Sequence, residues 1–185
     1  QEKVLIADSR GESHTYDKVV FACHADETLK LLHDASPEEM RVLGAFGYQR
    51  NTAYLHRDTS IMPKRKRCWA SWVYHVEGAT AHAEAGGIGV TYWMNRLQSI
   101  DDRCPLFVTL NPARTLAEDL IFDRHIFEHP IFTGATLAAQ KELPKLQGQK
   151  NSYFCGAYTR YGFHEDGLLS AVQAAQSMGV VIPWH

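Results

Sequence analysis

The sequence predicts an α+β fold in which a mixed, largely antiparallel sheet domain is inserted between two pieces of an outer domain. Near both ends of the chain, strand-like stretches are continuously apolar, which is typical of strands covered on both faces. Between Tyr48 and Phe132 the apolar residues instead alternate with a period of two, which is typical of strands with one wet face. With 185 residues, the chain is long enough for two interleaved parts. We place the inserted domain at residues 36–147 and the outer pieces at 1–35 and 148–185.

The first piece is expected to form a strand at residues 4–9, a turn, and a second strand at 16–23. Gly11 supplies the positive φ that the turn needs. Asp26 and Glu27 favour the start of a helix, because acidic side chains interact well with its positive end. Ser36, Pro37 and Glu39 form a capping box that predicts a second short helix.

The middle block contains five strand-like runs rich in aromatic and β-branched residues. A helix over about 136–143, a short strand at 152–156 and a last helix over about 166–178 follow. Gly179 is the expected C-terminal stop of that last helix. The five runs are residues 48–58, 68–76, 89–98, 106–111 and 124–132.

Composition excludes several classes of protein. The formal net charge of −2 gives no general attraction to nucleic acid or to acidic lipid. The basic block 64–67 has no interleaved aromatic residues, so we interpret it as a solvated loop. No apolar run approaches the ~18 residues of a membrane-spanning helix. Four cysteines lie far apart without a C-x-x-C pair, which favours a reduced, cytoplasmic compartment. We therefore expect a cytoplasmic protein with no nucleic-acid partner and no membrane span.

The ten histidines do not predict a metal site. His125 and His129 are spaced for a shared metal only on a helix. Their surroundings alternate like a strand, which would separate the two residues by about 13 Å. We therefore expect no bound metal.

The C-terminal stretch carries the most information about function. A strand runs into Gly156, a loop of glycine and aromatic residues follows, and a helix is expected to open at Asp166 and Gly167. First-turn N–H groups of a helix can hold an anion or an electron-rich carbonyl. The alternative is an ordinary helix start in which Asp166 is the cap.

These residues resemble the C-terminal cofactor segment of the flavin-containing amine oxidase family. The matching positions are Phe154-Cys155-Gly156, Gly162, Gly167 and the small-residue run 170–175. Residues 16–32 resemble the stretch in which the family's FAD-binding domain leads into its substrate domain. More narrowly, the chain is similar to the C-terminal half of bacterial proteins described as predicted NAD/FAD-binding or amine oxidase-like proteins.

The resemblance implies a flavoprotein oxidoreductase. The pieces 1–35 and 148–185 would belong to an FAD-binding domain, and 36–147 would be its substrate-binding domain. The protein would transfer a hydride from a small-molecule substrate, an amine or an apolar compound, to flavin N5. The dinucleotide fingerprint G-x-G-x-x-G is absent from this sequence, which implies that FAD also requires an N-terminal half absent from this chain. We expect the chain alone to be inactive, and no catalytic residue is assigned.

The resemblance also implies which residues would contact FAD. Backbone amides of Gly167 and Leu168 would approach the pyrimidine edge of the flavin. Gly156 and Ala157 would lie along the ribityl chain and pyrophosphate. The family often has an acidic residue where this sequence has Ala157, and Glu165 or Asp166 could substitute for it.

Aromatic residues in the middle block are candidates for the substrate pocket, although they could equally be core residues. A second hypothesis is a non-catalytic module that binds a small ligand or a protein without flavin. The pocket candidates are Trp72, Tyr92, Trp93 and Asn95.

Overall fold

The computed structural model describes residues 3–75 and 89–184, which divide into two compact units. The outer unit combines residues 1–49 and 129–185, and the inner unit is the continuous segment 50–128. The expected boundaries at 36 and 147 differ from these. Residues 36–49 and 129–147 join the outer unit because Leu43, Phe46, Leu143 and Leu146 are buried in its apolar core.

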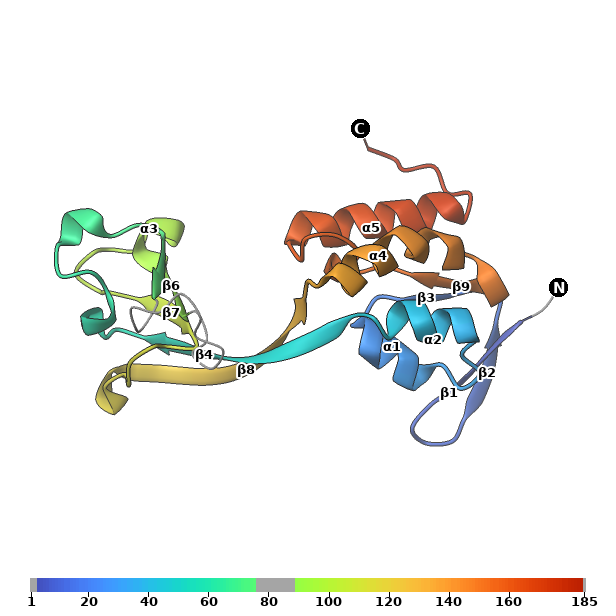
Figure 1. Cartoon of the computed structure of the whole chain (residues 1–185), viewed down its shortest axis with the longest axis horizontal. Helices are drawn as coiled ribbons and strands as arrows, with labels where there is room; N and C mark the ends of the chain where they lie inside the picture. The colour runs from blue at the N-terminus through green and yellow to red at the C-terminus, as the bar shows by residue number, and fades with distance from the viewer. Residues whose placement is uncertain (1–2, 76–88, 185) are drawn as a thin grey trace. The chain divides into compact units, whose positions relative to one another are not determined.

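The outer unit begins with a hairpin of β1 (Val4–Ala7) and β2 (Ser13–Tyr16). Gly11 in the turn has the expected positive φ of 84°. The predicted strand 16–23 is wrong in one respect, because the hairpin ends at Tyr16 and a separate strand, β3 (Val19–Phe21), follows. β3 pairs in parallel with β9 (Ser152–Phe154), and Figure 1 shows the two side by side.

Four helices of the outer unit accompany this parallel pair: α1 (Ala25–Leu31), α2 (Pro37–Leu43), α4 (Gly134–Glu142) and α5 (His164–Ser177). The capping box of α2 is confirmed, since Glu39 N–H donates to Ser36 Oγ and Ser36 N–H donates to Glu39 Oε2 at 2.7 Å. Gly179 ends α5 with a φ of 84°. Short 3₁₀ turns link these elements at Leu143–Leu146, Gln149–Asn151 and Ala157–Thr159.

The inner unit is built on one five-stranded sheet with the order β5-β6-β7-β4-β8. The pairs β5–β6, β6–β7 and β7–β4 are antiparallel, as the period of two predicts. Each of the five predicted runs overlaps one of its strands, although β4 and β8 begin before the runs 48–58 and 124–132. Val76, the last residue of one run, lies outside the described residues. The strands are β4 (Gly47–His56), β5 (Trp72–His75), β6 (Gly89–Trp93), β7 (Phe107–Leu110) and β8 (Ile121–Ile131).

Two features of the inner unit differ from a plain sheet. The run 89–98 is not one strand, because the chain turns into helix α3 (Met94–Gln98) once Trp93 has entered the core with Phe107. β8 lies at the edge of the sheet, and its apolar side chains Phe122, Ile126 and Phe127 are exposed. The described part of this unit also has short 3₁₀ turns at Thr59–Ile61, Lys66–Cys68 and Glu118–Leu120.

Helices in the described part of the chain are too short or too polar to cross a membrane.

Candidate functional site

The candidate site lies in the outer unit, at the carboxyl ends of β3 and β9. Parallel strands bring their carboxyl ends to the same edge, which is where ligands bind in open sheets of this kind. Cys23 and His24 follow β3, and Gly156 and Ala157 follow β9. The N–H of Cys155 donates to the carbonyl oxygen of Phe21 at 3.0 Å, which extends the pairing to this edge.

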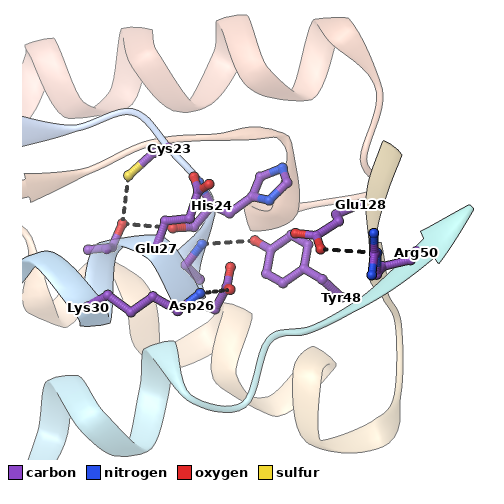
Figure 2. Close-up of polar contacts among 10 residues, drawn as sticks. Cys23, His24, Asp26, Glu27, Lys30, Tyr48, Arg50 and Glu128 are labelled. Carbon is purple, nitrogen blue, oxygen red and sulfur yellow. Dashed lines mark hydrogen bonds and ion pairs between the residues drawn. The ribbon is translucent and has the colours of Figure 1, made fainter. Parts of the chain in front are cut away.

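His24 and Tyr48 form the first part of the site. Their rings stack with centroids 4.3 Å apart, and Tyr48 Oη accepts a hydrogen bond from the N–H of Ala25 at 2.9 Å (Figure 2). Burial raises the pKa of Tyr48 to about 12, so the phenol is neutral at physiological pH. Nδ1 of His24 is buried and has no hydrogen-bond partner among the described residues.

Tyr158 forms the second part. Its side chain is only 3% exposed, and its ring packs edge-on against Phe46 with centroids 4.9 Å apart. A Cβ on Gly156 would come within 2.6 Å of the Tyr158 ring, so glycine is required there. Burial raises the pKa of Tyr158, and its buried Oη has no hydrogen-bond partner within residues 3–75 and 89–184.

Cys155, at this edge, is not an activated nucleophile. Burial raises the pKa of Cys155, and nearby Cys23 raises it further. Cys23 Sγ lies 3.3 Å from Thr28 Oγ1. A thiol needs a lowered pKa to react readily. The site therefore offers the neutral phenols of Tyr48 and Tyr158, together with the imidazole of His24, as hydrogen-bonding groups.

Helix α5 begins at His164, two residues earlier than the sequence predicts. Gly167 is consequently the fourth residue of the helix, and its N–H donates to the carbonyl oxygen of Phe163 at 3.2 Å. Leu168 is the fifth residue, where amides belong to the regular helical hydrogen bonding. The N–H of Gly167 is therefore used within α5. That the backbone at Gly167 and Leu168 approaches the flavin edge stays a prediction.

Asp166 explains the early start of the helix. Its carboxylate is buried and accepts hydrogen bonds from the N–H groups of Tyr161 and Phe163 at 3.2 and 3.0 Å. Arg160 Nε lies 3.7 Å from the other carboxylate oxygen. Asp166 thus fixes its own loop, as the alternative interpretation expects, and its contact with a cofactor stays a prediction. Glu165 is exposed.

Ser170 links α5 to the loop that follows β9, a role that the sequence analysis missed. Its hydroxyl accepts from the N–H of Gly156 at 2.8 Å and donates to the carbonyl oxygen of Gly167 at 2.7 Å. A Cβ built on Gly167 would lie 3.8 Å from the nitrogen of Ala157. Small residues at 156, 157 and 167 therefore allow the helix to approach the loop, and the small-residue run at 170–175 was the available signal.

The predicted substrate-pocket residues separate into two kinds. Trp93 is buried in the core of the inner unit. Asn95 is buried as well; its amide donates to the carbonyl oxygens of Asp101 and Cys104 and accepts from the N–H of Leu106, so it holds a loop instead of lining a pocket. Trp72 and Tyr92 face each other across β5 and β6 with ring centroids 5.9 Å apart, and Trp72 is about half exposed.

His125 and His129 both lie on strand β8, as the alternating pattern predicts. Within residues 3–75 and 89–184, no group of three or more His, Cys, Asp or Glu side chains is arranged to hold a metal ion.

The fold is found in parts of larger enzymes. One is the CLA-producing fatty acid isomerase from P. acnes, which matches 98% of this chain with a TM-score of 0.63 and 12% identity. Another is reduced UDP-galactopyranose mutase, which matches 96% of this chain with a TM-score of 0.59 and 11% identity. The chain spans 45% of the length of each enzyme. No family model and no curated protein matches the sequence.

Proposed function

We propose that the chain is the C-terminal part of an FAD-dependent, amine oxidase-like oxidoreductase that moves a hydride from a small-molecule substrate to flavin N5. One observation carries the proposal: the carboxyl ends of β3 and β9 meet α5 on a fold shared with an isomerase and with a mutase described in its reduced form. A reduced form implies a group that accepts electrons. Segments 148–185 and 1–35 would contribute to FAD binding.

The residues at this edge fit a polar ligand. Nδ1 of His24 and Oη of Tyr158 are buried without partners among the described residues, and buried polar atoms normally have one. We infer that His24, Tyr48 and Ala157 face the cofactor. When bound, FAD would supply the electron acceptor. The residues of this chain would orient it through hydrogen bonds, because the neutral phenol of Tyr48 and the neutral thiol of Cys155 are poor bases at physiological pH.

The substrate is proposed to be an amine or an apolar compound, with Trp72 and Tyr92 as candidate contacts. The isomerase of similar fold acts on a fatty acid, which supports the apolar choice. Both similar structures are enzymes by name, so the non-catalytic binding module is not favoured.

The absorption spectrum of the full-length protein tests the proposal. We expect the purified protein to show flavin bands, and Gly167→Asp to lower its flavin content at least about tenfold, because a carboxylate would stand beside Ala157 where the cofactor approaches. A Cβ fits at position 167, so the variant should remain folded.

Gly134→Asp is the matched control, because a Cβ at position 134, also near a helix start, meets nothing within 4 Å. A colourless wild-type protein would overturn the cofactor proposal. Equal flavin content in the two variants would overturn the placement beside Gly167.

A further inference from the structure

Strand β8 presents an apolar edge of the inner sheet. It is the last strand in the order β5-β6-β7-β4-β8, so among the described strands it neighbours β4 only. Residues 122–129 are all exposed, and Phe122, Ile126 and Phe127 expose between 47 and 58% of their surface. Edge strands are normally short, charged or covered, because a long apolar edge pairs readily with another strand. A strand of 11 residues with this surface therefore indicates an edge that is covered in the functional protein.

Two features indicate which backbone groups of β8 point away from β4. Pro130 has no N–H, and a proline within an edge strand turns its nitrogen to the outer side. The N–H of Arg124 donates to Oδ1 of the neighbouring Asp123 at 2.8 Å, so a side chain serves it in place of a strand. Both residues have even numbers, and backbone groups alternate in direction along a strand. The N–H and C=O groups of Arg124, Ile126 and Glu128 therefore point to the outer edge.

The sequence of β8 is self-complementary about Ile126. When two β8 strands pair antiparallel with Ile126 opposite Ile126, Arg124 of each copy lies opposite Glu128 of the other. In the same register His125 lies opposite Phe127. Directly opposite residues share one face of the sheet, so their side chains contact each other. Two-fold symmetry makes each of these contacts occur twice.

Other registers lose this complementarity. Because the outward-pointing groups must meet each other, the register can change only in steps of two residues. A step in one direction places Glu128 opposite Phe122, and a step in the other places it opposite Ile126. Arg124 is then opposite Ile126 or Pro130. Both alternatives pair charged side chains with apolar ones, so the charges favour the register centred on Ile126.

The charged side chains of β8 also have partners within the chain. The guanidinium of Arg124 contacts the carboxylate of Glu118, and Glu128 Oε1 lies 4.0 Å from Arg50 Nε. Exposed ion pairs of this kind contribute little to stability, so they do not prevent a rearrangement. The attraction between two β8 strands would come from backbone hydrogen bonds and from burial of the apolar side chains, whereas the charges would select the register.

We propose that β8 is the surface through which two copies of the full-length protein associate, antiparallel and centred on Ile126, so that their five-stranded sheets join into one. A second copy fits this edge because the strand that complements the charges of β8 is β8 itself. One pair of strands is a small interface, so we expect the dimer to dissociate in the micromolar range. The proposal does not depend on flavin binding.

Sedimentation equilibrium of the full-length protein, from submicromolar to several hundred micromolar, tests the proposal. We expect a monomer–dimer equilibrium. Glu128→Lys places a lysine opposite Arg124 at both contacts and should weaken the dimer at least about tenfold. Arg124→Glu should do the same with two carboxylates. The double variant Arg124→Glu/Glu128→Lys restores opposite charges and should dimerise as the wild-type protein does, which a folding defect would not allow.

Glu12→Lys is the matched control, because it is the same charge reversal at an exposed position in the turn between β1 and β2. It should leave the dimer unchanged. A full-length protein that stays monomeric overturns the proposal, as it would if another segment of the same chain covered β8. A dimer that Glu128→Lys weakens no more than Glu12→Lys, or that the double variant does not restore, uses another surface or register and overturns it as well. Flavin content of the same samples reports separately on the proposed oxidoreductase.

Discussion

At the scale of single residues, Ser170 connects helix α5 to the turn after β9 by hydrogen bonds, which its place in a small-residue run does not indicate. Its hydroxyl accepts a hydrogen bond from the N–H of Gly156, in the turn after β9, and donates one to the carbonyl oxygen of Gly167 in its own helix. The position of α5 against this turn therefore depends on Ser170. Gly156 and Gly167 could be singled out from the sequence, but the contact that joins their two segments could not. Their contact spans 14 residues between Gly156 and Ser170, and no local rule specifies that distance.

Ser170→Ala should lower the free energy of unfolding by about 1–3 kcal/mol, because the N–H of Gly156 loses its partner, the buried hydroxyl of Ser170. Denaturant unfolding measures the change. Ser177→Ala is the matched control, since the Ser177 hydroxyl bonds only Ala174 of its own helix and should cost much less. Equal losses in the two variants would contradict a tertiary role for Ser170.

At the scale of elements, a helix, strand or turn could be predicted where residues next to one another in the sequence determine it. The capping box at Ser36, the turn at Gly11 and the five strands follow from adjacent residues and were predicted. The start of α5 was placed too late because Asp166 bonds backward to Tyr161 and Phe163, outside the pattern of the helix itself. The hydrogen bonds that link His56 to His75 through two threonines require the register of four strands, which alternation cannot supply.

The inner sheet should lose stability as the pH falls from 7 to 5. The folded-state pKa of His56 is lowered by burial, so below its ordinary value of 6.5 the unfolded chain binds more protons than the folded one. The stabilisation is complete above about pH 6.5 and declines below it. Thermal unfolding at several pH values measures the slope.

His56→Gln should flatten this pH dependence, although His75, whose pKa is also lowered, retains part of it. His14→Gln, at an exposed position on β2, should leave the slope unchanged. An unchanged slope in His56→Gln would show that the buried ring does not titrate in this range.

At the scale of the whole molecule, the sequence predicted an interrupted outer part and a continuous inner part, with different boundaries from the two observed units. The alternation of apolar and polar residues starts near Tyr48, close to the observed division between the two units after Gln49. The predicted inserted domain, 36–147, included the segments that form α2 and α4. Both helices instead belong to the outer unit, because their apolar side chains are buried with Phe154 and Tyr158, which lie in another part of the sequence.

The exposed edge strand β8 has a consequence for handling the protein. A strand of 11 residues at a sheet edge can pair with a strand of a second molecule, and the exposed apolar side chains of Phe122, Ile126 and Phe127 would favour such pairing. We expect the isolated 185-residue chain to aggregate with increasing concentration, as measured by light scattering. Ile126→Lys should suppress this, because a charge on an edge strand opposes intermolecular β-pairing.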